Sequence, residues 1–122
     1  MKSLLGISGE EDEFAALSKL LTEDTINWES LTVAILDSDN TSIAPDTITN
    51  RIDEMLETTD TSVTTTQLPG DPGSTLIEHA ETHDFDAIAI GGGERSPLGK
   101  LTLNQTAEFV VLNSKITVLL VR

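Results

Sequence analysis

The stretch IAIGGGERSPLGK, residues 88–100, decides the fold, because an apolar run in it ends in three glycines. A short apolar run bounded by turn residues is typical of a buried strand. The charged segment after the glycines precedes a helical pattern, which makes the stretch a strand-to-helix connection. Such a connection can bring backbone amides close to an anion. It therefore raises the question of whether this chain binds phosphate.

Apolar runs alternate with helical patterns along the rest of the chain. We expect strands over 3–8, 30–36, 62–68, 87–91 and 116–121, and helices over 11–21, 46–58, 72–83 and 103–112. This βαβαβαβαβ order predicts an α/β fold, a three-layer sandwich in which helices cover both faces of a five-stranded parallel sheet. Ligands of such sheets bind at the carboxyl ends of the strands, where the winding direction reverses. Physics alone leaves several strand orders open.

The helices carry apolar stripes and recognisable ends. Asp71 can cap the third helix, with Pro72 at its first position. Thr102 and Gln105 form a T-x-x-Q capping box before the fourth helix. The residues expected in the core are Phe14, Leu17, Leu20, Leu21, Ile48, Ile52, Met55, Leu56, Leu103, Ala107, Val110 and Val111.

Length and composition allow one domain with an aliphatic core. The chain has 122 residues, of which 38% are hydrophobic and only 3% aromatic, and it has no cysteine. We therefore expect a single domain over residues 1–122 without disulfides or thiolate metal sites. No apolar run approaches the ~20 residues of a membrane span, and the N-terminus lacks a signal-peptide pattern. These features predict a soluble, cytoplasmic protein that does not bind membranes.

Acidic residues dominate the charge. Asp and Glu number 21 against 7 Lys and Arg, a formal net charge of −14. This self-repulsion destabilises a compact state in dilute salt, whereas about 1 M salt shortens the Debye length to about 3 Å. We expect a host with a salty cytoplasm, such as a halophilic archaeon, and the alternative is an ordinary acidic protein. Nucleic acid is not an expected partner, because a polyanion would be repelled.

Three mechanisms for binding an anion converge on the loop after the fourth strand. Gly91, Gly92 and Gly93 allow positive φ and close backbone approach, and Arg95 and Lys100 add positive charge. The start of the fourth helix adds free amides. The alternative is a tight turn whose cations balance acidic neighbours. The spacing fits neither a Walker A loop nor the dinucleotide motif G-x-G-x-x-G.

The sequence resembles the universal stress protein family over nearly its whole length. The likeness rests on "GDP" at 70–72, "DFDAIAIG" at 84–91, "RSPLGKL" at 95–101 and "ITVLLVR" at 116–122, with weaker support near the N-terminus. The resemblance implies a Rossmann-like fold of the adenine nucleotide alpha hydrolase type, with strand order 3-2-1-4-5. It also implies a homodimer through the last strand. Many members bind ATP through the motif G-x2-G-x9-G-[ST], and others lack the motif.

Here that motif is eroded. Gly91 matches its first glycine, but the second falls on Glu94, and the final pair falls on Asn104 and Gln105. The family's early V-D-G-S becomes Ile7, Ser8, Gly9 and Glu10, so that Ser8 replaces an aspartate. Glu94 adds negative charge, Asn104 tolerates positive φ, and Gln105 is bulkier than a hydroxyl residue. Together these changes disfavour tight ATP binding.

The candidate nucleotide site is therefore a degenerate one. Its residues are Ser8, Gly9, Gly91, Gly92, Gly93, Glu94, Arg95, Ser96, Lys100, Asn104 and Gln105. Its ligands would be ATP or AMP with magnesium, or a small anion such as sulfate or chloride. The residues expected at the dimer interface are Ile116, Thr117, Val118, Leu119, Leu120 and Val121.

Other polar clusters have simpler explanations. His79 and His83 have metal-ligand spacing but no apparent third ligand, so a solvated helix face is expected rather than a metal site. The acidic residues 10–13 favour the start of the first helix through its dipole and are expected to be hydrated. Asp37 and Asp39 follow the second strand and are read as turn formers, with ribose or magnesium contact as the alternative.

No nucleophile–base pair is visible near the glycines, so we do not expect an enzyme. The favoured function is a homodimeric stress-response module that acts through partners. The alternative function is an ATP- or AMP-binding sensor, and a third possibility is a weak hydrolase.

Overall fold

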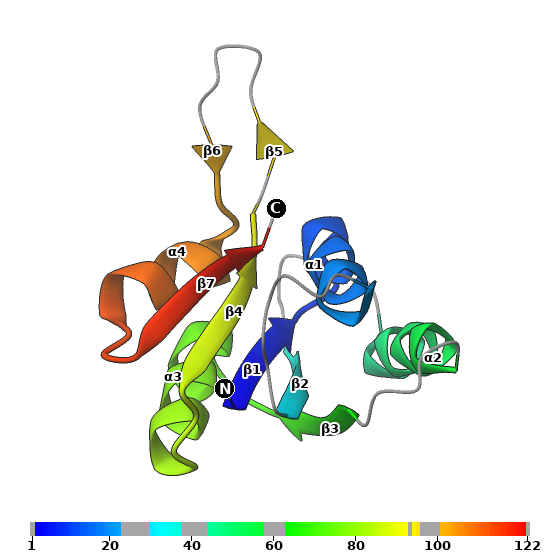
Figure 1. Ribbon diagram of the computed structural model, residues 1–122, viewed down its shortest axis with the longest axis horizontal. Helices are drawn as coiled ribbons and strands as arrows, with labels where there is room; N and C mark the ends of the chain where they lie inside the picture. Colours follow the sequence, from blue (N-terminus) through cyan, green and yellow to red (C-terminus); the bar gives the residue numbers. More distant parts are fainter. Residues whose placement is uncertain are drawn as a thin grey trace.

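A five-stranded parallel sheet forms the centre of the protein (Figure 1). The computed structural model describes residues 2–22, 30–37, 44–57, 63–92, 94–95 and 101–121. The sheet strands are β1 (Lys2–Ile7), β2 (Ser30–Leu36), β3 (Val63–Leu68), β4 (Ala87–Gly91) and β7 (Thr117–Val121). Their order is β3-β2-β1-β4-β7, which confirms the expected order 3-2-1-4-5.

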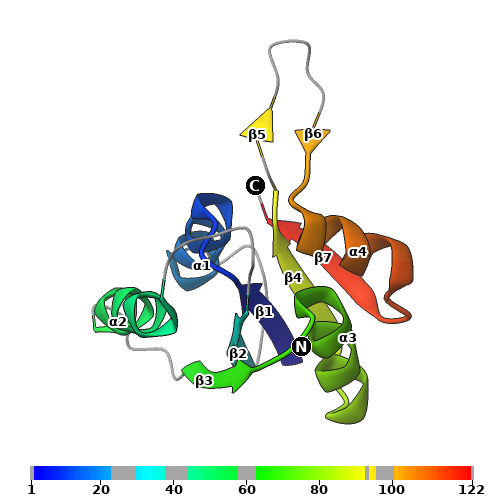
Figure 2. The ribbon, with the colours of Figure 1, turned by 180° about the vertical axis from the view of Figure 1, so that it is seen from behind.

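Two helices cover each face of the sheet (Figure 2). On one face lie α1 (Glu11–Thr22) and α2 (Pro45–Leu56), and on the other lie α3 (Pro72–Thr82) and α4 (Gln105–Asn113). Successive strand residues point to opposite faces, so Leu5 and Ile7 of β1 pack under α1 and α2, while Leu4 packs under α3 and α4. The three-layer α/β sandwich is thereby confirmed.

The expected core is confirmed except on the outer flank of α4. Phe14, Leu17, Leu20, Ile48, Ile52, Ala107 and Val110 are buried, and Leu21, Met55, Leu56 and Leu103 are partly buried against the core. The expectation for Val111 is wrong, because its exposed fraction is 49%. Phe109 meets Gly73 of α3, so Val111 lies on the flank of α4 that faces away from α3.

The ends of α3 and α4 give one confirmed prediction and one correction. The Asp71 side chain accepts a hydrogen bond from the Ser74 amide, with Pro72 opening α3, as expected. The prediction of a T-x-x-Q capping box is wrong, because Asn104 is the residue that caps α4. The side chain of Asn104 accepts from the Ala107 amide at 2.8 Å, a geometry that asparagine favours at this position.

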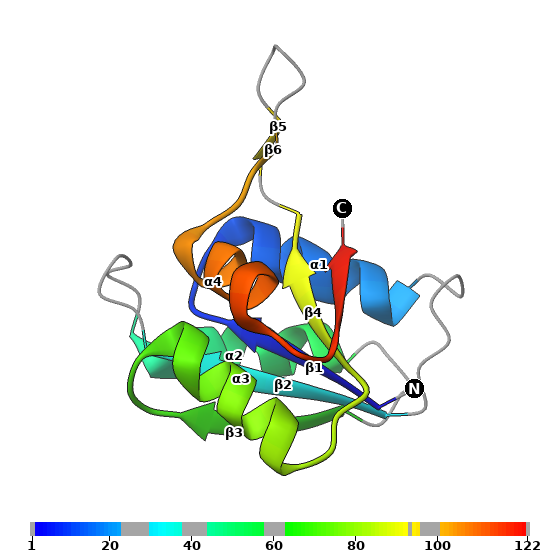
Figure 3. The ribbon, with the colours of Figure 1, turned by 90° about the vertical axis from the view of Figure 1, so that its left-hand side faces the viewer.

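A second, small sheet was not expected from the sequence. β5 (Glu94–Arg95) pairs antiparallel with β6 (Leu101–Thr102). This ribbon stands beyond the carboxyl ends of β4 and β7 (Figure 3). The chain between β4 and α4 therefore leaves the main sheet and returns to it, instead of turning directly into the helix.

Candidate functional site

The carboxyl ends of β1 and β4 lie side by side. They mark the switch point of the sheet, where the winding direction reverses. Ser3, Leu4 and Leu5 of β1 pair with Ala87, Ile88 and Ala89 of β4, while the other edge of β1 pairs with β2. The loop from β1 into α1 and the end of β4 therefore border the same region. Ligands of open α/β sheets bind in this position.

A single carboxylate closes the loop between β1 and α1. Oε1 of Glu13 accepts hydrogen bonds from the amides of Ser8 at 2.8 Å, Gly9 at 3.1 Å and Glu10 at 2.9 Å. The Ser8 hydroxyl donates to the same carboxylate, 3.1 Å from either oxygen. Only 3% of Glu13 is exposed. We call the three amides and the Ser8 hydroxyl the amide cradle.

Local sequence explains why the loop closes in this way. Glu10 precedes α1, and Glu13 is the third residue of the helix, a position from which a glutamate reaches back to the preceding amides. Gly9 has φ 114°, a conformation that residues with a Cβ seldom adopt. This turn at Gly9 lets the consecutive amides converge on one oxygen.

The cradle and the surrounding protein act on the Glu13 carboxyl in opposite directions. Burial raises its pKa from 4.5 to about 7, the hydrogen bonds from Ser8 and Glu10 oppose that rise, and the charge of Asp12 adds to it. The three amides donate to Oε1, whereas Oε2 accepts from the Ser8 hydroxyl. A proton on Oε2 therefore leaves Oε1 able to accept from all three amides.

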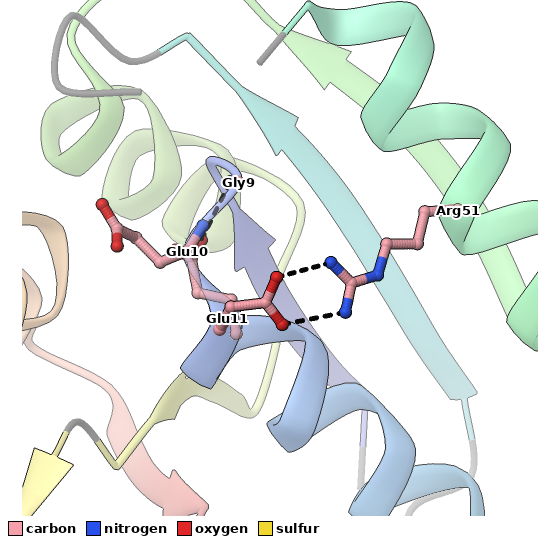
Figure 4. A network of polar contacts seen from close by, with 5 residues as sticks. Gly9, Glu10, Glu11 and Arg51 are labelled. Carbon is pink, nitrogen blue, oxygen red and sulfur yellow. Dashed lines mark hydrogen bonds and ion pairs between the residues drawn. The ribbon is translucent and has the colours of Figure 1, made fainter. Parts of the chain in front are cut away.

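The acidic residues 10–13 do not form one hydrated cluster, so that expectation is wrong for Glu13. Glu11 also has a partner, because both its oxygens contact the Arg51 guanidinium, at 2.7 and 2.9 Å (Figure 4). This hydrogen bonding lowers the pKa of Glu11. Arg51 also lies over the ring of Phe14, 3.9 Å from its centroid. In the same view, the side chain of Glu10 points away from Arg51.

The end of β4 makes a close approach, but to protein backbone. A Cβ on Gly91 would lie 2.7 Å from the carbonyl oxygen of Asp12 and 2.8 Å from its Oδ2. The amide of Gly92 donates to the carbonyl of Val121 at 2.8 Å. Gly91 and Gly92 do not have positive φ, unlike Gly9. Gly91 and Gly92 therefore do not use the positive φ that glycine allows, but Gly91 does provide the close backbone approach that was expected.

The remaining residues of the predicted site are only partly gathered there. Nδ2 of Asn104 lies 3.5 Å from Oδ2 of Asp12, which connects the start of α4 to the start of α1. Asn104 has φ −69°, so its tolerance of positive φ is not used. Gln105 is the first residue of α4, and the backbones of Glu94 and Arg95 belong to the ribbon. Gly93, Ser96 and Lys100 lie outside the described residues.

Sequence reasoning missed Asp12 and Glu13. In the sequence both belong to one run of acidic residues, although a glutamate in the third helical position is a known capping signal. The usual signal includes Ser or Thr at the cap, and here that position holds Glu10. The Asp12–Gly91 contact joins two distant segments and has no local signal.

The two histidines lie at the opposite end of the sheet. Their ring centroids are 4.1 Å apart, and Lys2 Nζ donates to the carbonyl of His83 at 2.6 Å. Asp37 accepts from the Gly70 amide at 3.1 Å, and Asp39 is outside the described residues. Within those residues, no group of three or more His, Cys, Asp or Glu is arranged to hold a metal ion. No helix in the described ranges is long and apolar enough to cross a membrane.

Comparisons with known proteins point to one family. The family model described as "Universal stress protein family" matches residues 6–122. The universal stress protein UspA from Lactobacillus plantarum superposes with a TM-score of 0.71 at 17% identity, covering 99% of this chain and 97% of that one. No curated protein sequence matches significantly.

Two further solved structures with the same fold are described as nucleotide complexes. A universal stress protein in complex with cAMP has a TM-score of 0.62 at 16% identity, covering 99% of this chain and 97% of that one. An Arabidopsis thaliana family member with AMP bound has a TM-score of 0.59 at 11% identity, covering 99% and 91% respectively. At these identities the likeness establishes a shared fold.

Proposed function

The chain belongs to the universal stress protein family, and we propose that it acts as a homodimeric stress-response module with a degenerate adenine-nucleotide site. In this proposal the protein works through partners and does not catalyse a reaction. Its two histidines support this view, because they lie with Lys2 at the amino ends of the strands, away from the switch point.

The observation that carries the proposal is the contact between Asp12 and Gly91. A polyphosphate at this site would need open backbone at the end of β4, but the Asp12 main chain and carboxylate already lie against Gly91. The next amide, that of Gly92, already donates to Val121. A carboxylate in this place also repels a phosphate group.

The ligand class comes from relatives and from the eroded motif. Solved relatives have been described with cAMP and with AMP. An adenine nucleotide is therefore the natural probe, and a sensor that still binds ATP or AMP is the rival function. The two functions differ in whether wild-type protein binds nucleotide at cellular concentrations.

Calorimetric titration separates them. Mg-ATP and AMP are titrated into the protein at about 2 M KCl, which screens its net charge. We expect no binding heat up to millimolar ligand. A dissociation constant in the micromolar range would contradict the degenerate site and favour the sensor.

The dimer is proposed to form through β7. β7 is an edge strand, and edge strands expose hydrogen-bonding groups that need a partner or protection. Leu120 is 41% exposed, and the neighbouring helix α4 exposes Val111 at 49% and Leu112 at 74%. A second copy of the chain would cover these apolar side chains in a two-fold arrangement.

Light scattering coupled to size exclusion tests the dimer. The wild type is expected at twice the mass of one chain, and Leu120→Lys at the mass of one chain. Thr65→Lys is the matched control, because it adds the same charge to an exposed position on β3, the opposite edge strand. A monomeric wild type, or equal dissociation by both variants, would contradict an interface on β7.

A further inference from the structure

We propose that Glu13 is a specificity-determining residue: its carboxyl group occupies the amide cradle and excludes an external anion from the β1 side of the site. The inference deepens the proposed function, on which it rests, by naming the residue that closes the site. It starts from the four donors that Ser8, Gly9 and Glu10 direct at one carboxylate.

The arrangement of donors fits an anion. Three consecutive amides converge on one oxygen within 3.1 Å, and a hydroxyl lies within 3.1 Å of both carboxylate oxygens. Consecutive amides that form a concavity bind carboxylates and phosphates in general. Here the occupant is attached to the chain, and a tethered group has a high effective concentration. A free anion would have to displace it.

A second carboxylate, that of Asp12, lies on the β4 side of the same region. Oδ2 of Asp12 lies against Gly91 and 3.5 Å from Asn104 at the start of α4. The ends of β1 and β4 therefore each have an acidic side chain of α1 in front of them. An anion that approaches the switch point meets the Asp12 carboxylate on one side and a cradle already filled by Glu13 on the other.

The competing explanation is that Glu13 is only a helix cap. A cap would stabilise α1 and leave ligand selectivity unchanged. The two explanations differ when the carboxylate is removed, because an empty cradle should accept a free anion and a lost cap should simply weaken the helix. Glu13→Ala empties the cradle. Glu13→Gln is the matched control, because its Oε1 can still accept from the three amides without a charge.

The test is thermal unfolding with potassium formate replacing potassium chloride at a constant total of about 2 M, which keeps the screening equal. Formate is a free carboxylate without a tether. We expect formate to raise the midpoint of Glu13→Ala saturably, by about 5 °C at the highest concentration. The wild type and Glu13→Gln should unfold at the same temperature in both salts. The absence of a formate-specific rise in Glu13→Ala would overturn the proposal.

Amide NMR on the wild type tests whether Glu13 fills the cradle, even if Glu13→Ala does not fold. The amide signals of Ser8, Gly9 and Glu10 should not move when formate is added, because Glu13 occupies the cradle. Saturable shifts of these three signals would show that the cradle is open and would overturn the proposal.

The formate result is independent of the proposed function. Micromolar AMP binding by the wild type would contradict the degenerate nucleotide site, whatever formate does. Formate binding by Glu13→Ala would still show that Glu13 fills the cradle. The same variant should also bind AMP at least about tenfold more tightly than the wild type, and an unchanged affinity would overturn the role of Glu13 in selectivity.

Discussion

Two segments leave neighbouring strands at the same end of the sheet, and their backbone amides find different hydrogen-bond acceptors. After β1, the chain turns at Gly9 and enters α1, and Glu13 accepts the loop amides. After β4, the chain continues beside β7, where Gly92 donates to Val121, and then forms the β5–β6 ribbon. One segment is closed by a side chain and the other by main chain.

This difference teaches where the region can be changed. A side chain that occupies a cradle can be removed by one substitution, which leaves the donors in place. Main-chain pairing to an edge strand is part of the sheet and cannot be removed without losing the strand. We therefore expect a ligand site to be opened by substitution on the β1 side.

The largest expected effect comes from removing the Glu13 oxygens. Glu13→Ala leaves three amides without their acceptor, and each buried donor left unsatisfied costs about 1–3 kcal/mol. We expect the free energy of unfolding, measured by chemical denaturation, to fall by roughly 4 kcal/mol. Glu13→Gln should lose less than half as much, since it keeps the acceptor. Equal losses would mean that the charge, and not the acceptor, holds the loop.

On the β4 side, the corresponding change adds a side chain to Gly91. A Cβ there would lie 2.7 Å from the Asp12 carbonyl oxygen, and main chain cannot give way as a flexible side chain can. Gly91→Val should reduce the free energy of unfolding by roughly 3 kcal/mol. Gly91→Ala, with fewer added atoms, should cost less. A tolerated valine would show that α1 is not held against β4.

The pH dependence of stability sharpens the account of the β1 side. The pKa of Glu13 is raised from 4.5 to about 7, so the folded state binds the proton more tightly than the unfolded state does. This contribution is full below pH 4.5 and is lost as the pH rises through about 7. The stability of the wild type relative to Glu13→Gln should therefore fall between pH 5 and 8, by on the order of 2 kcal/mol. Denaturation of both proteins at several pH values measures it, and the opposite slope would show that the amides hold the carboxylate ionised.

The smallest effect is expected at the ion pair beside the cradle. Arg51→Ala removes the contacts with Glu11 and with the ring of Phe14, but the Arg51 and Glu11 side chains are exposed. The midpoint of unfolding should fall slightly in dilute salt, and the part that comes from the ion pair should fade at about 1 M KCl. A loss that persists unchanged in high salt would assign the contribution to packing on Phe14.

Much of the fold was predictable because its signals are local. The runs at 30–36 and 87–91 have the bounds of β2 and β4, and Asp71 caps α3 as its position before Pro72 predicted. Ile48 and Ile52 are buried because a stripe with helical spacing must face the sheet. The ribbon was missed, because two strands of two residues each are too short to give a periodic signal.

The site was less predictable than the fold. The sequence marked the carboxyl end of β4 and predicted a role for Gly91 in nucleotide binding, but it gave no sign that Asp12 packs against this glycine. Glu13 was hidden among acidic neighbours that differ only in where the helix directs them. Their different environments, one buried and one paired with Arg51, arise from the turn at Gly9 and the packing of α2.

By itself, the sequence determined the alternation of strands and helices and the aliphatic core, because both follow from residue type and local spacing. Its motifs carried the resemblance to the family. Only the tertiary structure decided what occupies the switch point. Asp12 and Gly91 are far apart along the chain and meet because β1 and β4 pair in the sheet. The state of the Glu13 carboxyl depends on burial and on donors within hydrogen-bond reach, and both exist only once the chain has folded.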